Sequence, residues 1–151
     1  MKKTPQQQKL EEMLRSSQVV SGGFLGDDRR DLTEIIDQDL TEIAALGTTP
    51  EALAKRMREI TIAAIRGLGL WVDLPGGRRA KIDEAKGQMI CPWPDDDFRC
   101  GKRVTTLEDE IAGETILWTD LSIHLIEKHG FFEGKGAPFR VEPKQLVRML
   151  P

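Results

Sequence analysis

The feature that most constrains the fold of this chain is a change of character near Gly67. Before this residue, hydrophobic side chains recur at helical spacing, and Phe24 is the only aromatic residue. After it come all three Trp, four of the five Phe, both Cys and both His. The pattern predicts an α+β protein, with a helical region over 1–69 and a β-hairpin and helix module over 70–151. The two regions either form separate domains or pack as one.

Helix-capping residues divide the N-terminal region into three predicted helices. A helix with a thin apolar edge is expected from Thr4 to about residue 18. Asp31 is a good N-cap for a periodic segment that ends at Gly47. Thr49, followed by proline at the first helical position, begins another helix that runs to Gly67. Carboxylates on the second helix, including Asp39, are expected on its solvated face.

The segment 42–56 resembles a helix-turn-helix motif. It contains a helix, a glycine-containing turn and a second helix that carries Lys55, Arg56 and, just beyond, Arg58. In a DNA-binding member of that class, the second helix enters the major groove. Because the first helix is acidic, phosphate contacts from its flank are unfavourable, and a simple packing hairpin is the preferred interpretation.

The C-terminal region shows alternating patterns bounded by turn residues, as expected for hairpins. A helix follows, with Thr119 as its cap and Gly130 at its end, and a final helix begins at Pro143. The strands are expected over 70–73, 80–83, 87–90, 103–107 and 114–118.

All the cysteines and histidines of the chain lie within 91–129. Eight residues separate Cys91 from Cys100, and four separate His124 from His129. Thiolate and imidazole are the ligands that zinc prefers. The order of the four residues therefore suggests a zinc site.

This arrangement resembles the Cys₂His₂ zinc-binding fold, in which a hairpin supplies two sulfurs and the next helix supplies two nitrogens. The resemblance covers residues 88–130 and is strongest over 121–130, where a leucine stands three residues before the first of two histidines. It implies Cys91, Cys100, His124 and His129 as zinc ligands. The chain departs from the family in its cysteine spacing, where two to four residues are usual, and in the 23 residues between Cys100 and His124, where about 12 are usual.

Other interpretations of the same residues remain open. Without a metal, Cys91 is a small buried strand residue and His129 a helix C-terminal cation. A cysteine nucleophile with a histidine base would make a small enzyme, but no oxyanion-hole motif accompanies Cys91. The acidic run 95–97 lacks the pattern of a calcium loop and is expected to be a solvated turn.

The segment 131–140 interleaves three phenylalanines with glycines and cations. Aromatic rings beside cations can stack on bases or bind an anionic partner. We therefore take Phe131, Phe132, Lys135 and Arg140 as candidate partner-binding residues. The alternative is that the phenylalanines fill the core beneath the preceding helix.

The composition limits the class of function. The net charge of −3 gives no overall attraction to nucleic acid or anionic lipid. No apolar run approaches the roughly 20 residues that span a bilayer, and two cysteines without a secretory signal predict the reducing cytoplasm. We expect a non-enzymatic interaction or regulatory protein with a protein partner and no catalytic residues. The alternatives are a DNA-binding regulator and a small cysteine- or metal-dependent enzyme.

Overall fold

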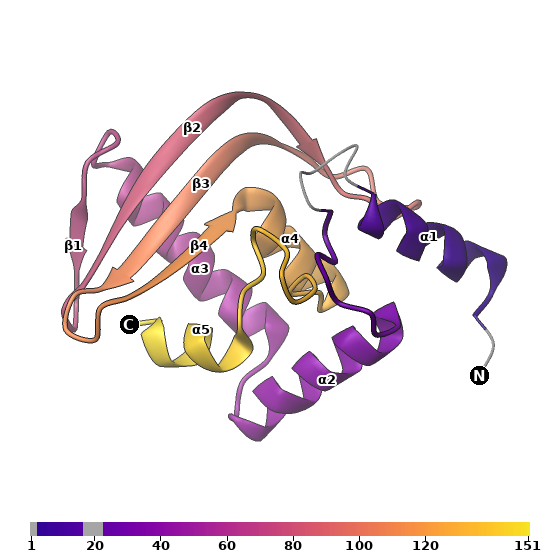
Figure 1. The fold of residues 1–151 in the computed structure, drawn as a ribbon. Coiled ribbons are helices and arrows are strands. Elements are labelled where there is room, and N and C mark those ends of the chain that lie inside the picture. The colour runs from indigo at the N-terminus through magenta and orange to yellow at the C-terminus, as the bar shows by residue number, and fades with distance from the viewer. Residues whose placement is uncertain (1–2, 17–22) are drawn as a thin grey trace.

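The computed structural model describes residues 3–16 and 23–151, and it confirms the α+β class. Within these residues, helices lead into an antiparallel sheet, and two shorter helices follow (Figure 1). The predicted first helix ends earlier than expected, and residue 18 lies outside the described residues. In chain order the elements are α1 (Pro5–Arg15), α2 (Leu32–Ala45), α3 (Pro50–Ile65), β1 (Val72–Leu74), β2 (Arg78–Ile90), β3 (Arg99–Asp109), β4 (Glu114–Thr119), α4 (Asp120–His129) and α5 (Pro143–Met149).

The helices begin close to where the sequence predicts, and at α3 and α4 a threonine cap satisfies a backbone donor that a helix leaves unpaired. Asp31 stands at the N-cap of α2 as expected but makes no side-chain capping hydrogen bond to the described residues. The Thr49 side chain accepts a hydrogen bond from the backbone of Ala52, and the Thr119 side chain accepts one from Ser122. Gly130 ends α4 in the left-handed conformation, with φ of 61°.

The sheet has the order β1-β2-β3-β4, and its two central strands arch over the molecule (Figure 1). The sequence predicted two short strands where β2 is one strand of 13 residues. A bulge between Ala85 and Gln88, with Gly87 at φ of 113°, lets the strand bend without ending. Strand β1 pairs with the start of β2, and β4 pairs with the end of β3. Among the described residues, the remaining parts, 84–90 of β2 and 99–103 of β3, form a two-stranded ribbon. We call this part of the sheet the β2–β3 ribbon.

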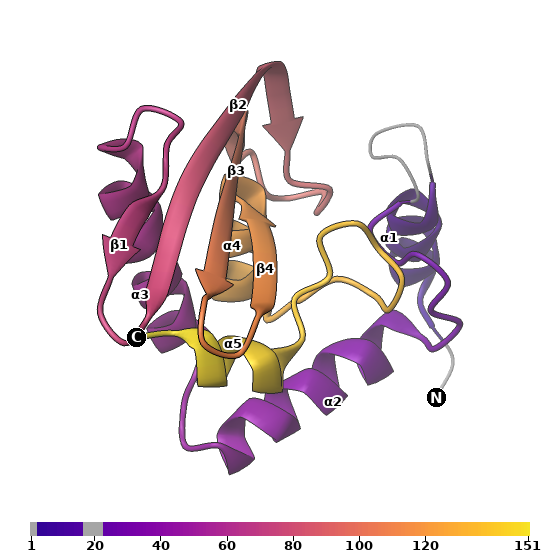
Figure 2. The ribbon, with the colours of Figure 1, turned by 60° about the vertical axis from the view of Figure 1, so that its left-hand side comes forward.

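Helices α3 and α4 pack side by side on one face of the sheet, as Figures 1 and 2 show. The main core lies between them and the strands, with Met57, Leu107 and Trp118 each fully buried. The indole of Trp118 donates a hydrogen bond of 3.0 Å to the Thr61 hydroxyl, which lies 2.7 Å from that of Thr105. These bonds satisfy polar groups that burial would otherwise leave unpaired.

A second core joins the far end of the ribbon to the helices. It contains Leu14 of α1, Ile35 of α2, Cys91 at the end of β2, and Leu125 and Phe131 in and after α4. All five are buried, and Leu14, Ile35 and Leu125 have no exposed surface. Both cores therefore combine residues from the N-terminal and C-terminal regions.

A buried ion pair fastens α2 to the segment that follows α4. Asp39 is 2 % exposed and accepts hydrogen bonds from both terminal nitrogens of Arg140. The expectation that Asp39 lies on a solvated face is thus wrong. The helical period located the polar face correctly, but the C-terminal segment covers that face with a cation that neutralises the carboxylate.

Candidate metal centre

The loop between β2 and β3 brings a thiol and a carboxylate together. The backbone N–H of Cys91 donates to the carbonyl of Phe98 at 3.1 Å, which closes the loop at its base. Inside it, the Asp96 N–H donates to the carbonyl of Trp93 at 3.2 Å, and Asp96 Oδ1 accepts from the Phe98 N–H at 3.0 Å. These turn contacts fix Asp96 and leave its other oxygen, Oδ2, available to α4.

Helix α4 supplies the two imidazoles. His124 lies in the body of the helix, and His129 is its last residue, next to the left-handed Gly130. Five positions correspond to 500°, so the two side chains leave an ideal helix about 140° apart. Both rings nevertheless reach one carboxylate oxygen of the loop.

Four donor atoms converge at this point. The Nε2 atoms of His124 and His129 lie 2.7 and 2.8 Å from Asp96 Oδ2, and Cys91 Sγ lies 3.6 Å from His129 Nε2. All four donor atoms lie within 4.8 Å of one another. Tetrahedral zinc with these ligands holds its donors roughly 3.3 to 3.6 Å apart. Binding the ion would therefore lengthen the two carboxylate–imidazole distances by about 0.6 Å and shorten the widest separation by about 1.2 Å.

Aromatic rings from the same loop hold both imidazoles. The Trp93 ring stacks on His129 at a centroid distance of 4.0 Å, and the Phe98 ring stacks on His124 at 3.9 Å with an interplanar angle of 3°. Trp93 also meets Phe131 edge to face at 5.5 Å. The stacking restricts ring rotation and therefore orients both Nε2 atoms before any ligand binds.

The electrostatics of the cluster follow from burial and from the central carboxylate. Burial raises the pKa of the Cys91 thiol to about 11, and the nearby Asp96 carboxylate adds to this increase. Burial lowers the pKa of His129 despite its hydrogen bond to Asp96. Burial alone would raise the pKa of Asp96, but hydrogen bonds from Phe98, His129 and His124 outweigh it and lower that pKa. The thiol of the cluster is therefore neutral and its central carboxylate ionised.

The structure brings together three of the four residues that the resemblance implies, namely Cys91, His124 and His129, and adds Asp96. Cys100 is not part of the group. Cys91 lies opposite Phe98 at the base of the loop. Cys100 follows Phe98 by two residues and lies opposite Met89 in the β2–β3 pairing.

Sequence reasoning missed Asp96 because it lies in a run of three aspartates. Asp95 and Asp97 are exposed, as expected of a solvated turn, whereas the Asp96 side chain is only 12 % exposed. Asp96 differs from the two neighbouring aspartates in its position within the loop. The middle aspartate faces into a loop that carries an aromatic residue on each side, and those aromatic residues pack on the histidines.

The segment 131–140 is largely internal. Phe131 and Phe132 are each 1 % exposed and belong to the second and main cores, respectively. The Arg140 side chain is 7 % exposed and is engaged by Asp39 and Glu142. Of the four candidate partner-binding residues, only Lys135 is exposed. Phe131 and Phe132 therefore fill the cores, as the alternative interpretation expected, whereas Phe139 is only half-buried.

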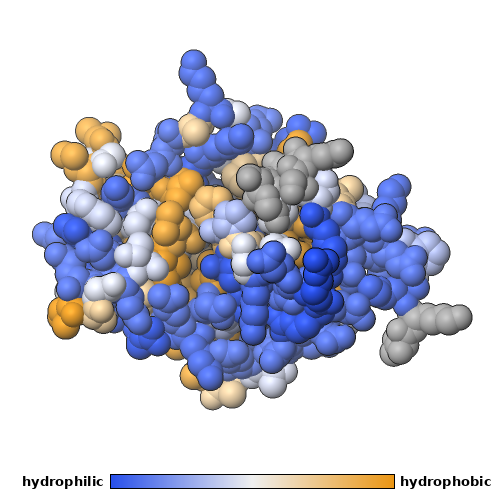
Figure 3. Space-filling view, in the orientation of Figure 1, coloured by the Kyte–Doolittle hydropathy of each residue, from blue (hydrophilic) through white to orange (hydrophobic). Residues whose placement is uncertain are grey.

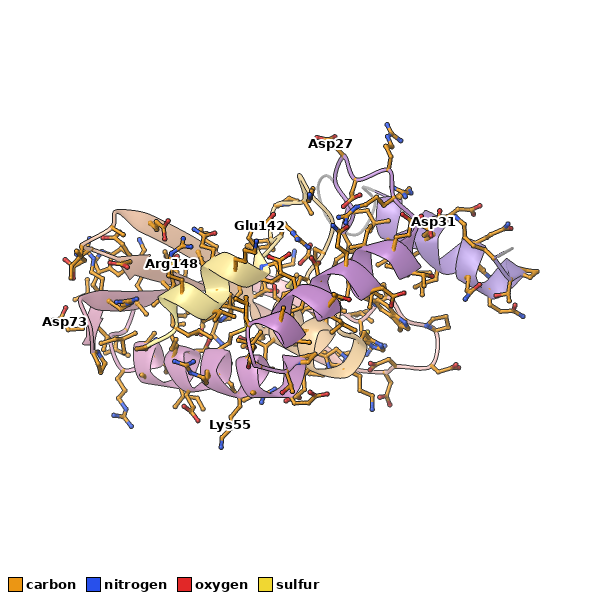
Figure 4. The ribbon with its side chains drawn as sticks, turned by 90° about the horizontal axis from the view of Figure 1, so that it is seen from below. Asp27, Asp31, Lys55, Asp73, Glu142 and Arg148 are labelled. Atoms are coloured by element: carbon orange, nitrogen blue, oxygen red, sulfur yellow. The ribbon has the colours of Figure 1, made fainter. Side chains whose placement is uncertain are left out.

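The candidate DNA-binding cations lie along α3. Lys55 projects from the helix into solvent (Figure 4). Arg56 donates to the backbone carbonyl of Pro151, and Arg58 forms an exposed ion pair of 3.1 Å with Glu127. Two of the three cations thus have partners within the chain.

Comparisons of the chain with protein-family models, with curated proteins and with solved structures found no match. None of the helices in the described part of the chain combines the length and the apolar character that crossing a membrane requires.

Proposed function

We propose that this protein is a non-enzymatic interaction protein whose C-terminal module is stabilised by one zinc ion, bound by Cys91, Asp96, His124 and His129. The observation that carries the proposal is the convergence of four donor atoms within 4.8 Å. The donors come from a loop and a helix that are separated by more than twenty residues of sequence, so their meeting is a product of the tertiary fold.

The donor set favours zinc over other abundant metals. One thiolate and two imidazoles are borderline-soft ligands, whereas calcium and magnesium prefer shells of oxygen. Four protein donors complete a tetrahedron, which is the arrangement of structural zinc sites. Binding would deprotonate the Cys91 thiol, since a bound cation reverses the effect of burial on its pKa.

The same features argue against a cysteine enzyme. A nucleophilic cysteine needs a lowered pKa, and burial raises the pKa of Cys91 to about 11. The two stacked rings, Trp93 and Phe98, cover the imidazoles that a general base would have to expose. The cluster is therefore better suited to holding the chain than to transforming a substrate.

The zinc would fasten the end of the ribbon to α4 and so shape the surface beside it. A groove of about 410 Å³ lies there, lined on one side by ribbon residues such as Met89 and Lys102 and on the other by Pro138 and Phe139. The segment 131–140 therefore contributes to a candidate partner surface through these two residues, while its buried members support them. A mostly apolar groove with a few polar groups is a common form of binding site.

The test is metal analysis of the purified protein with matched variants. We expect about one zinc per chain in the unaltered protein and in Cys100→Ser, and loss of zinc in Cys91→Ser. A second matched pair uses the acidic run: Asp96→Asn should weaken zinc binding about 10- to 100-fold or more, and Asp97→Asn should leave it unchanged.

Cobalt substitution identifies the ligands directly. The sulfur-to-cobalt charge-transfer band should appear in the unaltered protein and in Cys100→Ser and should be absent from Cys91→Ser. Absence of zinc from the unaltered protein, with no cobalt band, would show that the four residues form a metal-free hydrogen-bonded cluster and would refute the proposal.

A further inference from the structure

A second surface, remote from the metal centre, carries an unusual concentration of exposed hydrophobic side chains. Ile62 and Ile65 at the end of α3 are 54 % and 38 % exposed, and Leu68 and Leu70 in the turn to β1 are 91 % and 74 % exposed. Figure 3 shows hydrophobic surface at the end of the molecule where this turn lies. We call these four residues the α3–β1 patch. A cluster of this kind marks a contact surface more often than isolated exposed leucines do.

The backbone presents Leu68 outward at a conformational cost. Its φ is 49°, in the left-handed region that bulky residues avoid. Hydrogen bonds from the Leu68 N–H to the Ile65 carbonyl and from the Leu70 N–H to the Gly67 carbonyl fix this turn. Glycine would adopt the same conformation without strain. A leucine at this position therefore points to a role for its side chain outside its own chain.

A hollow lies directly beside this projection. It has a volume of about 350 Å³ and is lined by Ile65, Leu68, Gly69, Ile82 and Glu84. Three of its five lining residues are hydrophobic, and among the described residues no strand pairs with the adjacent edge of β2 beyond Ala80. One surface thus carries both a projecting leucine and a largely hydrophobic depression with room for a leucine side chain. Such a surface is complementary to itself, as a twofold interface requires.

The charges beside the hollow are also complementary under a twofold axis. Arg66 is exposed, follows Ile65 directly, and has no ion-pair partner among the described residues. The Glu84 side chain is 67 % exposed and comes no nearer than 4.0 Å to Arg103. A second copy related by a twofold axis can pair Arg66 of each chain with Glu84 of the other, which gives two reciprocal ion pairs.

A partner is not expected to bind here by adding a β-strand to the free edge of β2. The free edge of β2 carries Lys81 and Lys86, and the bulge at Gly87 interrupts its line of backbone donors and acceptors. Lysines and bulges are the features that discourage edge-to-edge strand pairing. Contact through side chains of the α3–β1 patch is therefore favoured over extension of the sheet.

We propose that the α3–β1 patch is the contact surface of a symmetric homodimer, in which Leu68 of each copy enters the hollow of the other. The dimer contact does not involve the metal centre, so the dimer proposal does not depend on the zinc proposal.

Sedimentation equilibrium over a wide range of concentration tests the dimer. We expect a monomer–dimer equilibrium for the unaltered protein. Leu68→Gly should raise the dissociation constant about a hundredfold or more, since two leucine side chains lose their burial per dimer. The control is Ile111→Ser, which removes a side chain that is 84 % exposed in the turn between β3 and β4 and should leave association unchanged.

Leu68→Gly also distinguishes contact from folding. Its unfolding midpoint at dilute concentration should equal or exceed that of the unaltered protein, because glycine relieves the strain at this position. A charge exchange gives a second readout: Arg66→Glu should weaken association, and adding Glu84→Arg should restore it. A protein that stays monomeric at every concentration, or a Leu68→Gly variant that associates like the unaltered protein, would overturn the proposal.

Discussion

Glu133 gives the sharpest prediction about stability, because its carboxyl group is buried with one oxygen unpaired among the residues that the structure describes. Glu133 is 4 % exposed, and among the described residues its Oε1 has no hydrogen-bond partner. Arg140 is nearby, but it donates its hydrogen bonds to Asp39, to Glu142 and to the backbone carbonyl of Glu133. Burial therefore raises the pKa of Glu133 to about 8, and the field of Arg140 only partly opposes this. The folded protein keeps a proton here that the unfolded chain releases.

The free energy of unfolding depends on pH because the pKa of Glu133 is raised only in the folded state. Below the unfolded pKa of 4.5 both states are protonated, and between that value and about 8 only the folded state is. The free energy of unfolding therefore falls as pH rises through this window, by about 1.4 kcal/mol per pH unit at most. At pH 7 the accumulated loss is about 3 kcal/mol, and above pH 8 it is about 5 kcal/mol.

Glu133→Gln removes the titration and keeps the shape of the side chain. Urea unfolding between pH 5 and pH 8 should show the unaltered protein losing stability relative to the variant, with the difference reaching about 3 kcal/mol at pH 7. Taking this difference cancels every titration that is common to both proteins. The control is Glu142→Gln, which alters an exposed partner of the same Arg140 and should run parallel to the unaltered protein. If the stability of Glu133→Gln changes with pH in the same way as that of the unaltered protein, the reasoning is refuted.

Two further substitutions test buried polar contacts by urea unfolding. Asp39→Ala leaves the buried Arg140 guanidinium without its main partner and should cost about 3 kcal/mol or more; a loss below about 1 kcal/mol would mean that the pair is effectively solvated. Thr61→Val leaves the indole N–H of Trp118 and the hydroxyl of Thr105 without their shared partner, at a cost of about 1–3 kcal/mol; no loss of stability would show that these groups find other partners.

Local patterns predicted much of the fold. Caps at Thr49 and Thr119 and the stop at Gly130 are encoded within a few residues, so the sequence placed α3 and α4 closely. The length of β2 was not predictable in the same way. The sequence predicted separate strands over 80–83 and 87–90, whereas pairing with β3 on either side of the bulge makes the strand continuous.

The candidate site shows the same division between local and tertiary information. Cys91, His124 and His129 could be selected because residues of these types are scarce in the chain. Choosing between Cys100 and Asp96 requires the register of the β2–β3 pairing, which places Phe98 opposite Cys91. Asp39 was misassigned for a related reason: its partner Arg140 lies about a hundred residues away in the chain, beyond the reach of any helical pattern.

The two ends of the β2–β3 ribbon are held by different means. One end continues into the four-stranded sheet over the main core, and the other ends in the loop that carries Cys91 and Asp96. Two strands alone are only marginally stable in water. The ribbon therefore behaves as a strap between two anchors, and its outer half is the unit most prone to local opening when the outer anchor loosens. With zinc bound as proposed, order in this part of the chain would depend on the supply of metal in the surroundings, while the main core remained folded.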